Sequence, residues 1–433
     1  PTPDHLRGPH YLSIALPEEG TGMSLLEEKS LADPEIQEDP VAYHHALQDH
    51  PIWWDERLGF FICARYDVMR RILRDVKTFS NVGSQTMDGL KAPPPEVTEI
   101  RRSMQPQVNT LVTNDPPGHT RFRQMVDNPF APKKVRANWR ASIDRIVAET
   151  LEEFVADGHC DFVKQFAEPV PLRVIADALG VPREDAPKFK RWSDASVAPL
   201  GMMISEEEHI ECTRQVKEMQ DYFIAEFDRR RAAPTDDLLS HLVHVRVEGE
   251  PPLTTPEMIS ITQQLLVAGN ETTTNALAAG MRLLVDHPDQ EAAMRADPSR
   301  VRIFVEETLR LESPTQGLFR VVTEDTELAG VRLPKGSRIM LRFAAANRDP
   351  AQYPQPDRLD VTRKNSGTNV AFGAGIHHCL GAGLAREEMH SAFGQILERM
   401  CNPRFQPGRN DFRHYPSMIL RGMEHLWIEF DPA

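Results

Sequence analysis

A stretch of about thirty residues that begins at Thr255 constrains the fold of this chain most strongly. Pro256 and Glu257 suit the first turn of a helix, where backbone N–H groups have no partner and the helix dipole favours a carboxylate. The pattern continues through MISITQQLLVAGNETTTNALAAGMRLLVDHP. Apolar residues recur on several sides of this helix, so we expect much of it to be buried, with the clearest examples at Leu265, Leu266, Val267, Ala268, Ala276 and Leu277.

Three further helices are predicted at residues 132–158, from residue 297 onward, and directly after Cys379. Strands are few and short, with a hairpin in IWWDERLGFFICARY and alternating segments in TELAGVRLPKGSRIMLRF. No repeat or linker divides the chain. We therefore predict a mainly α fold with a small β portion, in one large domain over residues 1–433 whose first 45 residues form an irregular extension.

The composition excludes several classes of function. A net charge of −14, without a lysine- or arginine-rich tract, argues against nucleic acid as a partner. No apolar run is long enough for a membrane span, and the N-terminus lacks the basic start and apolar core of a signal peptide. The five cysteines show no paired spacing. We therefore expect a reduced, cytoplasmic protein without disulfides or a zinc ribbon.

One of these cysteines, Cys379, lies in the glycine-rich stretch FGAGIHHCLGAGLAREEM, residues 372–389. A phosphate-binding loop would need a lysine and a hydroxyl residue after its glycines, and neither follows. His377 and His378 are close in sequence, which is poor evidence for a nucleophilic cysteine with a histidine partner. The helix predicted after Cys379 favours a thiolate, and the glycines let a flat ligand approach the backbone. Haem ligation and a buried structural cysteine both stay open here.

The segment FGAGIHHCLG resembles the haem-binding signature of the cytochrome P-450 family. Phe372, Gly373 and Gly375 precede Cys379 in the family's order, and Gly381 follows it. The resemblance implies haem b as cofactor, with Cys379 as the iron ligand and the flanking residues beside the haem. It also implies that His377, at a position where the family often has arginine, donates to a haem propionate. No role follows for His378.

A charged pair, Glu307 and Arg310, lies within one turn of the helix that starts near residue 297. On its own, such a pair would be an exposed ion pair that stabilises the helix by about 0.2–0.5 kcal/mol. Beside the cysteine loop it resembles the family's Glu-x-x-Arg motif. The resemblance implies a structural role, with Arg358 of PDRLD as the third member of a charge-assisted hydrogen-bond network.

The segment AGNETT, residues 268–273, places a glycine and three polar residues inside the long helix. Such a glycine costs about 1 kcal/mol relative to alanine, and the threonines compete for backbone carbonyls, so we expect a distorted, buried turn. The segment resembles the family's oxygen-activation motif. The resemblance implies that Ala268 borders the haem, that Thr272 orders water, and that Glu271 supplies protons.

Four basic residues match family positions that contact the haem propionates. DPPGHTRFR, residues 115–123, supplies His119 and Arg123, LFRVVTED supplies Arg320, and the cysteine loop supplies His377. Each of these residues alone would be a solvated surface charge. Together, in the family's order, they favour a haem site.

The resemblance as a whole implies a monomeric monooxygenase that inserts one oxygen atom of O2 into a hydrophobic small molecule, by hydroxylation or epoxidation. Electrons would come from a ferredoxin and an NAD(P)H-dependent ferredoxin reductase, with Arg123 and Arg386 as docking residues. Family positions predict an apolar substrate pocket. Its expected members are Leu265, Ala268, Gln316, Leu318, Met418 and Ile419.

Two other functions stay open at this stage. One is a haem-thiolate protein that does not activate O2, such as a peroxygenase or an isomerase, which the Glu271–Thr272 pair disfavours. The other is a cysteine-nucleophile enzyme or a ligand sensor, which would be purified without the colour of haem.

Overall fold

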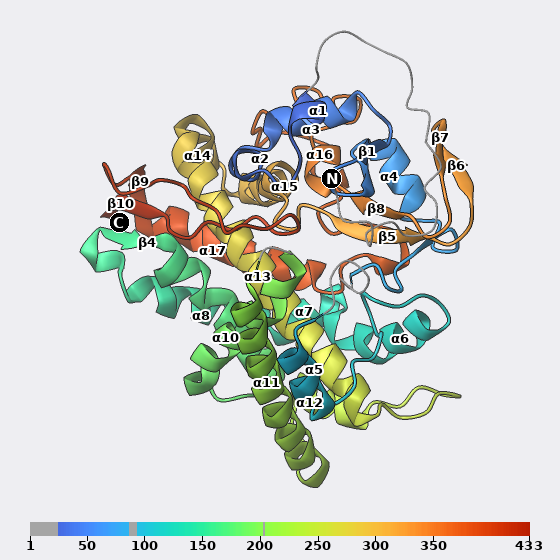
Figure 1. Cartoon of the computed structure of the whole chain (residues 1–433). Helices are drawn as coiled ribbons and strands as arrows, with labels where there is room; N and C mark the ends of the chain where they lie inside the picture. The colour runs from blue at the N-terminus through green and yellow to red at the C-terminus, as the bar shows by residue number, and fades with distance from the viewer. Residues whose placement is uncertain (1–24, 86–92, 202–203) are drawn as a thin grey trace.

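The long helix predicted from the sequence is α13, Thr255–Asp286, which runs through the middle of the computed structural model (Figure 1). A capping box fixes its start: the Thr254 hydroxyl accepts from the Glu257 N–H, and the Glu257 carboxylate accepts from the Thr254 N–H. The expected distortion at residues 268–273 is absent, because α-helical geometry is continuous there. The structure describes residues 25–85, 93–201 and 204–433.

Helices pack against α13 from several sides, and glycines set how close two of them come. At Gly269 an added Cβ would lie 3.3 Å from the Ile175 side chain, and at Gly280 it would clash with the edge of the Phe393 ring. None of the described helices is long and apolar enough to cross a membrane. The α-helices other than α13 are α1 Leu25–Glu28, α2 Pro34–Glu38, α3 Val41–Gln48, α4 Tyr66–Ile72, α5 Pro95–Arg102, α6 Gly118–Phe130, α7 Pro132–Asn138, α8 Arg140–Glu152, α9 Pro169–Leu179, α10 Ala186–Val197, α11 Glu206–Ala232, α12 Leu238–His244, α14 Pro288–Ala296, α15 Val301–Glu312, α16 Phe343–Ala346 and α17 Ala382–Arg399.

The strands form a five-stranded sheet in the order β1-β2-β8-β5-β3, a three-stranded sheet β4-β10-β9 and the hairpin β6-β7. In the five-stranded sheet only β2 and β8 run parallel. This sheet and the N-terminal helices lie on one side of α13, and α10 and α11 lie on the other (Figure 1). The strands are β1 Trp53–Asp55, β2 Phe60–Cys63, β3 Phe79–Ser80, β4 His159–Asp161, β5 Leu318–Val322, β6 Thr326–Leu328, β7 Val331–Leu333, β8 Arg338–Leu341, β9 Met400–Phe405 and β10 Trp427–Pro432.

Both predicted strand regions and the helix after Cys379 are confirmed, whereas the helix predicted at residues 132–158 is divided. The division falls at Trp139, whose ring packs edge-on against Phe130 at 5.3 Å. After α8, this helical segment ends in a short 3-10 turn, Val155–Asp157, which Gly158 closes in the left-handed conformation at φ 68°.

The prediction that residues 1–45 are irregular is wrong for the part that the structure describes. Residues 25–48 form α1, α2 and α3, and residues 1–24 lie outside the described part. Leu26, Leu31 and Ile36 are buried in a cluster that also holds side chains of β2, β5 and β8. The apolar residues in this segment were the available signal. They pack onto the sheet, and that contact stabilises helices too short to form alone.

Candidate functional site

Cys379 lies in a tight loop between a 3-10 turn, Gly375–His377, and the start of α17. Its N–H donates to the Phe372 carbonyl at 2.9 Å. Gly375 has φ +71°, and an added Cβ would be 2.5 Å from the Leu73 carbonyl oxygen, so only glycine fits there. Beside Gly373 and Gly381, by contrast, no described atom comes closer than 3.8 Å to such a Cβ. The loop is fixed by its backbone and leaves open space at two of its glycines.

Two arginines brace this loop. The Arg386 guanidinium lies 4.5 Å over the Phe372 ring and pairs with Glu306 at 2.5 Å. Arg123 donates to the His378 carbonyl at 2.9 Å and pairs with Asp127. The sequence assigned Arg123 to a propionate and both arginines to partner docking. In the structure the charges of both are already paired with carboxylates, so neither is a free cation.

The ionisation of Cys379 depends mainly on burial. Burial raises the pKa of the thiol, while the N–H groups of Gly381 and Ala382 and the charges of Arg123 and Arg386 lower it. The helix start alone therefore does not produce the thiolate that the sequence suggested. A metal cation bound to the sulfur would, because coordination deprotonates a thiol.

The other predicted propionate residues form a buried basic cluster made of His119, His377 and Arg320. The two imidazole rings lie 4.2 Å apart, and Arg320 is 3% exposed. Within the described residues no carboxylate lies within 4.0 Å of Arg320, whose one hydrogen bond goes to the Phe319 carbonyl at 2.8 Å. Burial lowers the pKa of Arg320 to about 10, with Asp115 opposing, and lowers that of His377 to about 3.

This basic cluster has the chemistry of a site for an anionic ligand. The His377 Nε2 is buried without a hydrogen-bond partner, and Arg320 has no counter-charge among the described residues. Haem b carries two propionate carboxylates and an iron that accepts a thiolate. The residues fit it: Cys379 would bind the iron, and Arg320, His119 and His377 would donate to the carboxylates.

The charged pair of α15 is fully buried, and a second arginine joins it to form a triad. Arg310 donates to both carboxylate oxygens of Glu307, at 2.7 and 3.0 Å, and both side chains are 0% exposed. The third member is Arg363, whose Nε donates to Glu307 at 2.9 Å. The prediction of Arg358 is wrong: its exposed side chain contacts Gln355, and only its carbonyl receives hydrogen bonds from Arg310 and Arg363. The signal was the second arginine in PDRLDVTR, five residues further on.

The acid and the alcohol of α13 point in different directions. Thr272 Oγ1 donates to the Ala268 carbonyl at 2.8 Å. Ala268 is exposed in the middle of this packed helix, which indicates open space over that turn. Glu271 instead turns toward α10, where Lys190 lies 3.5 Å away and the Ser193 hydroxyl donates at 3.4 Å. Burial raises the pKa of Glu271 to about 7, while Lys190 opposes this rise. Sequence reasoning missed the α10 residues, because contacts between distant helices leave no local pattern.

The six residues predicted to line a substrate pocket divide into two groups. Leu265 and Ala268 lie on α13, and Leu318 is half-buried on β5, two residues before Arg320. Gln316, Met418 and Ile419 form the second group, and Leu318 packs against the same cluster as Met418 and Ile419. Met418 and Ile419 are buried in the cluster formed by the N-terminal helices. The Gln316 amide donates to the carbonyls of Glu312 and Ser313, both at 2.7 Å. For these three residues a place in the substrate pocket stays a prediction, because burial alone does not exclude it: Leu265 of α13 is as buried as Ile419, at 8% exposure.

Comparison with known proteins gives this geometry its context. A sequence model of the family described as Cytochrome P450 matches residues 71–410. The 6-deoxyerythronolide B hydroxylase of Saccharopolyspora erythraea is 37% identical over 320 residues, 74% of this chain and 77% of the relative. The vitamin D(3) 25-hydroxylase of Pseudonocardia autotrophica is 33% identical over 398 residues, 91% of this chain and 92% of the relative. The structure of cytochrome P450 CYP109Q5 from Chondromyces apiculatus superposes with a TM-score of 0.81 at 33% identity, over 93% of this chain and 98% of that one. The chain therefore belongs to the cytochrome P450 family, and it is a haem b-dependent oxidoreductase of the monooxygenase class.

Proposed function

We propose that this enzyme inserts one oxygen atom of O2 into a hydrophobic small molecule, by hydroxylation or epoxidation, with electrons from a ferredoxin and its NAD(P)H-dependent reductase. The observation that carries the proposal is the acid–alcohol pair on α13 beside an exposed turn of that helix, Glu271 and Thr272 next to Ala268. Bound by Cys379, haem b supplies the iron at which dioxygen is activated. Protons must reach that oxygen from the protein.

Glu271 is suited to carry those protons. With a pKa of about 7, its carboxyl group is present in both protonation states near neutral pH, so it can both accept and release a proton. Its contacts with Lys190 and Ser193 hold it toward α10, so proton delivery requires the side chain to leave them. Thr272 would then hold a water molecule with the hydroxyl that now donates to the Ala268 carbonyl.

The substrate class rests on apolar residues of α13 and β5 and on the relatives. Leu265, Ala268 and Leu318 offer apolar contacts. The similar enzymes are named hydroxylases of 6-deoxyerythronolide B and of vitamin D(3). We propose a bulky, hydrophobic small molecule of this general kind as the substrate of this chain.

The electron donor would dock near the cysteine loop on a basic surface other than the one predicted. Helix α7 packs against α17, which starts at the loop, and it exposes Lys133 and Lys134. In the described residues no carboxylate lies within 4.0 Å of either lysine, in contrast to the paired Arg123 and Arg386. These lysines are the better complement for an acidic ferredoxin.

The replacement Thr272→Ala tests the proton relay. We expect the variant to bind haem and to keep consuming electrons while a large share is diverted to hydrogen peroxide, because water and oxygen are no longer held at the turn. Product formed per NAD(P)H consumed is the measurement. Thr274→Ala is the matched control, since Thr274 is buried on the opposite side of the same helix, about 200° from Thr272. If Thr272→Ala forms as much product per NAD(P)H consumed as the parent enzyme, Thr272 has no part in proton delivery.

A screen of hydrophobic compounds tests the substrate class. A compound that enters the site displaces water from the iron, which shifts the haem Soret band. We expect bulky terpenoid, steroid or macrolide-like compounds to shift the band and small polar compounds to leave it unchanged. A screen in which only small polar compounds shift the band would contradict the proposed class.

A further inference from the structure

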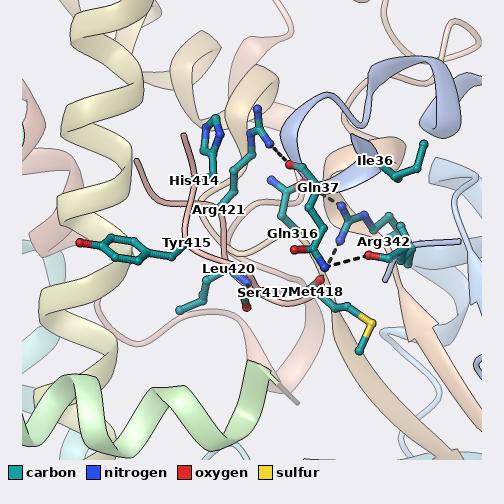
Figure 2. Close-up of a pocket in the computed structure, with 11 residues that line it drawn as sticks. Ile36, Gln37, Gln316, Arg342, His414, Tyr415, Ser417, Met418, Leu420 and Arg421 are labelled. Atoms are coloured by element: carbon teal, nitrogen blue, oxygen red, sulfur yellow. Dashed lines mark hydrogen bonds between the residues drawn. The ribbon is translucent and has the colours of Figure 1, made fainter. Parts of the chain in front are cut away.

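A small cavity lies between the N-terminal helices and the segment 414–421, and its lining includes no residue of the cysteine loop (Figure 2). It has room for about one group the size of a water molecule. Its wall is unusually basic for so small a space: Arg342, Arg421 and His414 line it together with the Ser417 hydroxyl.

Arg342 is the most deeply buried of these groups, at 4% exposure. It donates to three neutral acceptors: His44 Nε2 at 3.0 Å, the Met418 carbonyl at 2.8 Å and Gln316 Oε1 at 3.0 Å. A guanidinium has five N–H donors, so two of them have no acceptor in the described protein. Among the described residues no carboxylate lies within 4.0 Å of it. Burial and the charge of Arg421 lower its pKa to about 9.

The nearby carboxylates are occupied elsewhere. Glu38 accepts from the His414 imidazole at 2.8 Å. Glu312 lies 3.9 Å from Arg421 and 4.0 Å from Arg348, and so it is shared between those two arginines. The two acids thus reduce the charge at one end of the cavity and leave Arg342 uncompensated at the other. A buried, unpaired guanidinium is costly, and a counter-ion in the adjacent space removes that cost.

We propose that this cavity binds one monatomic anion of the size of chloride, held by Arg342 with help from Arg421 and the Ser417 hydroxyl. The space is too small for phosphate or a carboxylate, which need room for several atoms, and a chloride ion, which is somewhat larger than water, fits with a small outward shift of the wall. The ion joins the N-terminal helices to the segment 414–421, because Leu31 and Ile36 form part of the same wall. Its role is to stabilise the fold, and it is independent of the proposed reaction.

Thermal unfolding of the holoenzyme in different salts tests the site. We expect Tm to rise with sodium chloride relative to sodium gluconate at the same ionic strength, and the rise to saturate, because a specific ion stabilises the state that binds it. Arg342→Met should abolish the difference between the two salts. The control Arg404→Met, an exposed arginine of β9 with its own carboxylates, should keep it. Equal Tm values for the unaltered enzyme in both salts would overturn the proposal.

Crystals of the unaltered holoenzyme soaked in sodium bromide give a second measurement that does not depend on whether Arg342→Met folds. We expect an anomalous bromide peak within hydrogen-bonding distance of the Arg342 guanidinium. A cavity that holds only water, with no anomalous signal, would show that the charge is left unbalanced and would refute the anion site.

Discussion

The chain buries arginines in two different ways. In the triad of α15, Arg310 and Arg363 share the Glu307 carboxylate, and their other donors go to backbone carbonyls such as that of Arg358. In the basic cluster, Arg320 is buried beside two imidazoles and has one hydrogen bond, to the carbonyl of the residue before it. The triad is complete within the protein, whereas none of the described carboxylates pairs with Arg320 in the basic cluster.

This difference separates a structural site from a binding site on physical grounds. Taking a charge out of water is tolerated when the fold supplies its partner, and the triad therefore needs nothing from outside. A charge without a partner lowers stability, and it persists where a ligand supplies the missing charge. His377 of the basic cluster lies on the same loop as Cys379, and its ring is 4.2 Å from that of His119, so one ligand can contact both the thiol and the basic cluster.

Removing the shared carboxylate should have the largest effect. Glu307→Gln leaves two buried guanidiniums without a counter-charge, and we expect a loss of about 3–5 kcal/mol in the free energy of unfolding. Urea unfolding of the haem-loaded protein measures it. A loss below about 1 kcal/mol would mean that the triad stabilises the protein no more than an exposed ion pair does, and the contrast between the triad and the basic cluster would not hold.

The corrected membership of the triad can be tested with a matched pair of variants. Arg363→Met removes a charge-assisted bond to Glu307 and bonds to three carbonyls, so we expect a loss of about 1.5–3 kcal/mol. Arg358→Met removes only an exposed side chain, and its effect should stay within about 0.5 kcal/mol. Equal losses in the two variants would return Arg358 to the triad.

The basic cluster should respond in the opposite sense to the triad. Arg320→Met removes an uncompensated buried charge, so the haem-free protein should be as stable as the parent or more stable. The haem-loaded protein should bind its cofactor about 10–100-fold more weakly, because a partner of the propionates is lost. The rate of haem transfer to an acceptor globin measures this. Arg332→Met, on the exposed side of β7, is the control. Haem retention equal to that of the parent would show that Arg320 does not hold the cofactor.

The sequence predicted what depends on local pattern. The first turn and length of α13, the glycines around Cys379 and the i, i+3 spacing of Glu307 and Arg310 are all properties of short segments. It failed where a contact joins distant segments. Arg363 was missed because either of two nearby arginines could reach Glu307, and Lys190 because α10 meets α13 only in the fold. The ion pair of Arg386 was missed for the same reason, because its partner Glu306 lies 80 residues away in the sequence, whereas Asp127 is only one helical turn from Arg123 and that pair could have been found.

Glu388 is a buried acid for which the described residues supply no ion pair, the counterpart in opposite charge of Arg320. Glu388 of α17 is 2% exposed, its Oε2 has no hydrogen-bond partner among the described residues, and burial raises its pKa to about 8 from an ordinary 4.5. Between these two pKa values the folded state holds a proton that the unfolded state has lost. Stability therefore falls as pH rises from about 4.5 to 8, by at most about 1.4 kcal/mol per pH unit.

Glu388→Gln should remove that fall, so the variant gains stability over the parent as pH rises through this window. The adjacent residue provides a control of opposite sign. Glu387 pairs with Arg136 and Arg140, which lower its pKa, so Glu387→Gln should lose stability above about pH 4.5. Unfolding free energies measured from pH 5 to 8 distinguish the two. If Glu388→Gln and the parent changed in parallel across that range, the carboxyl would have a partner after all, and unpaired burial would be a property of the basic groups alone.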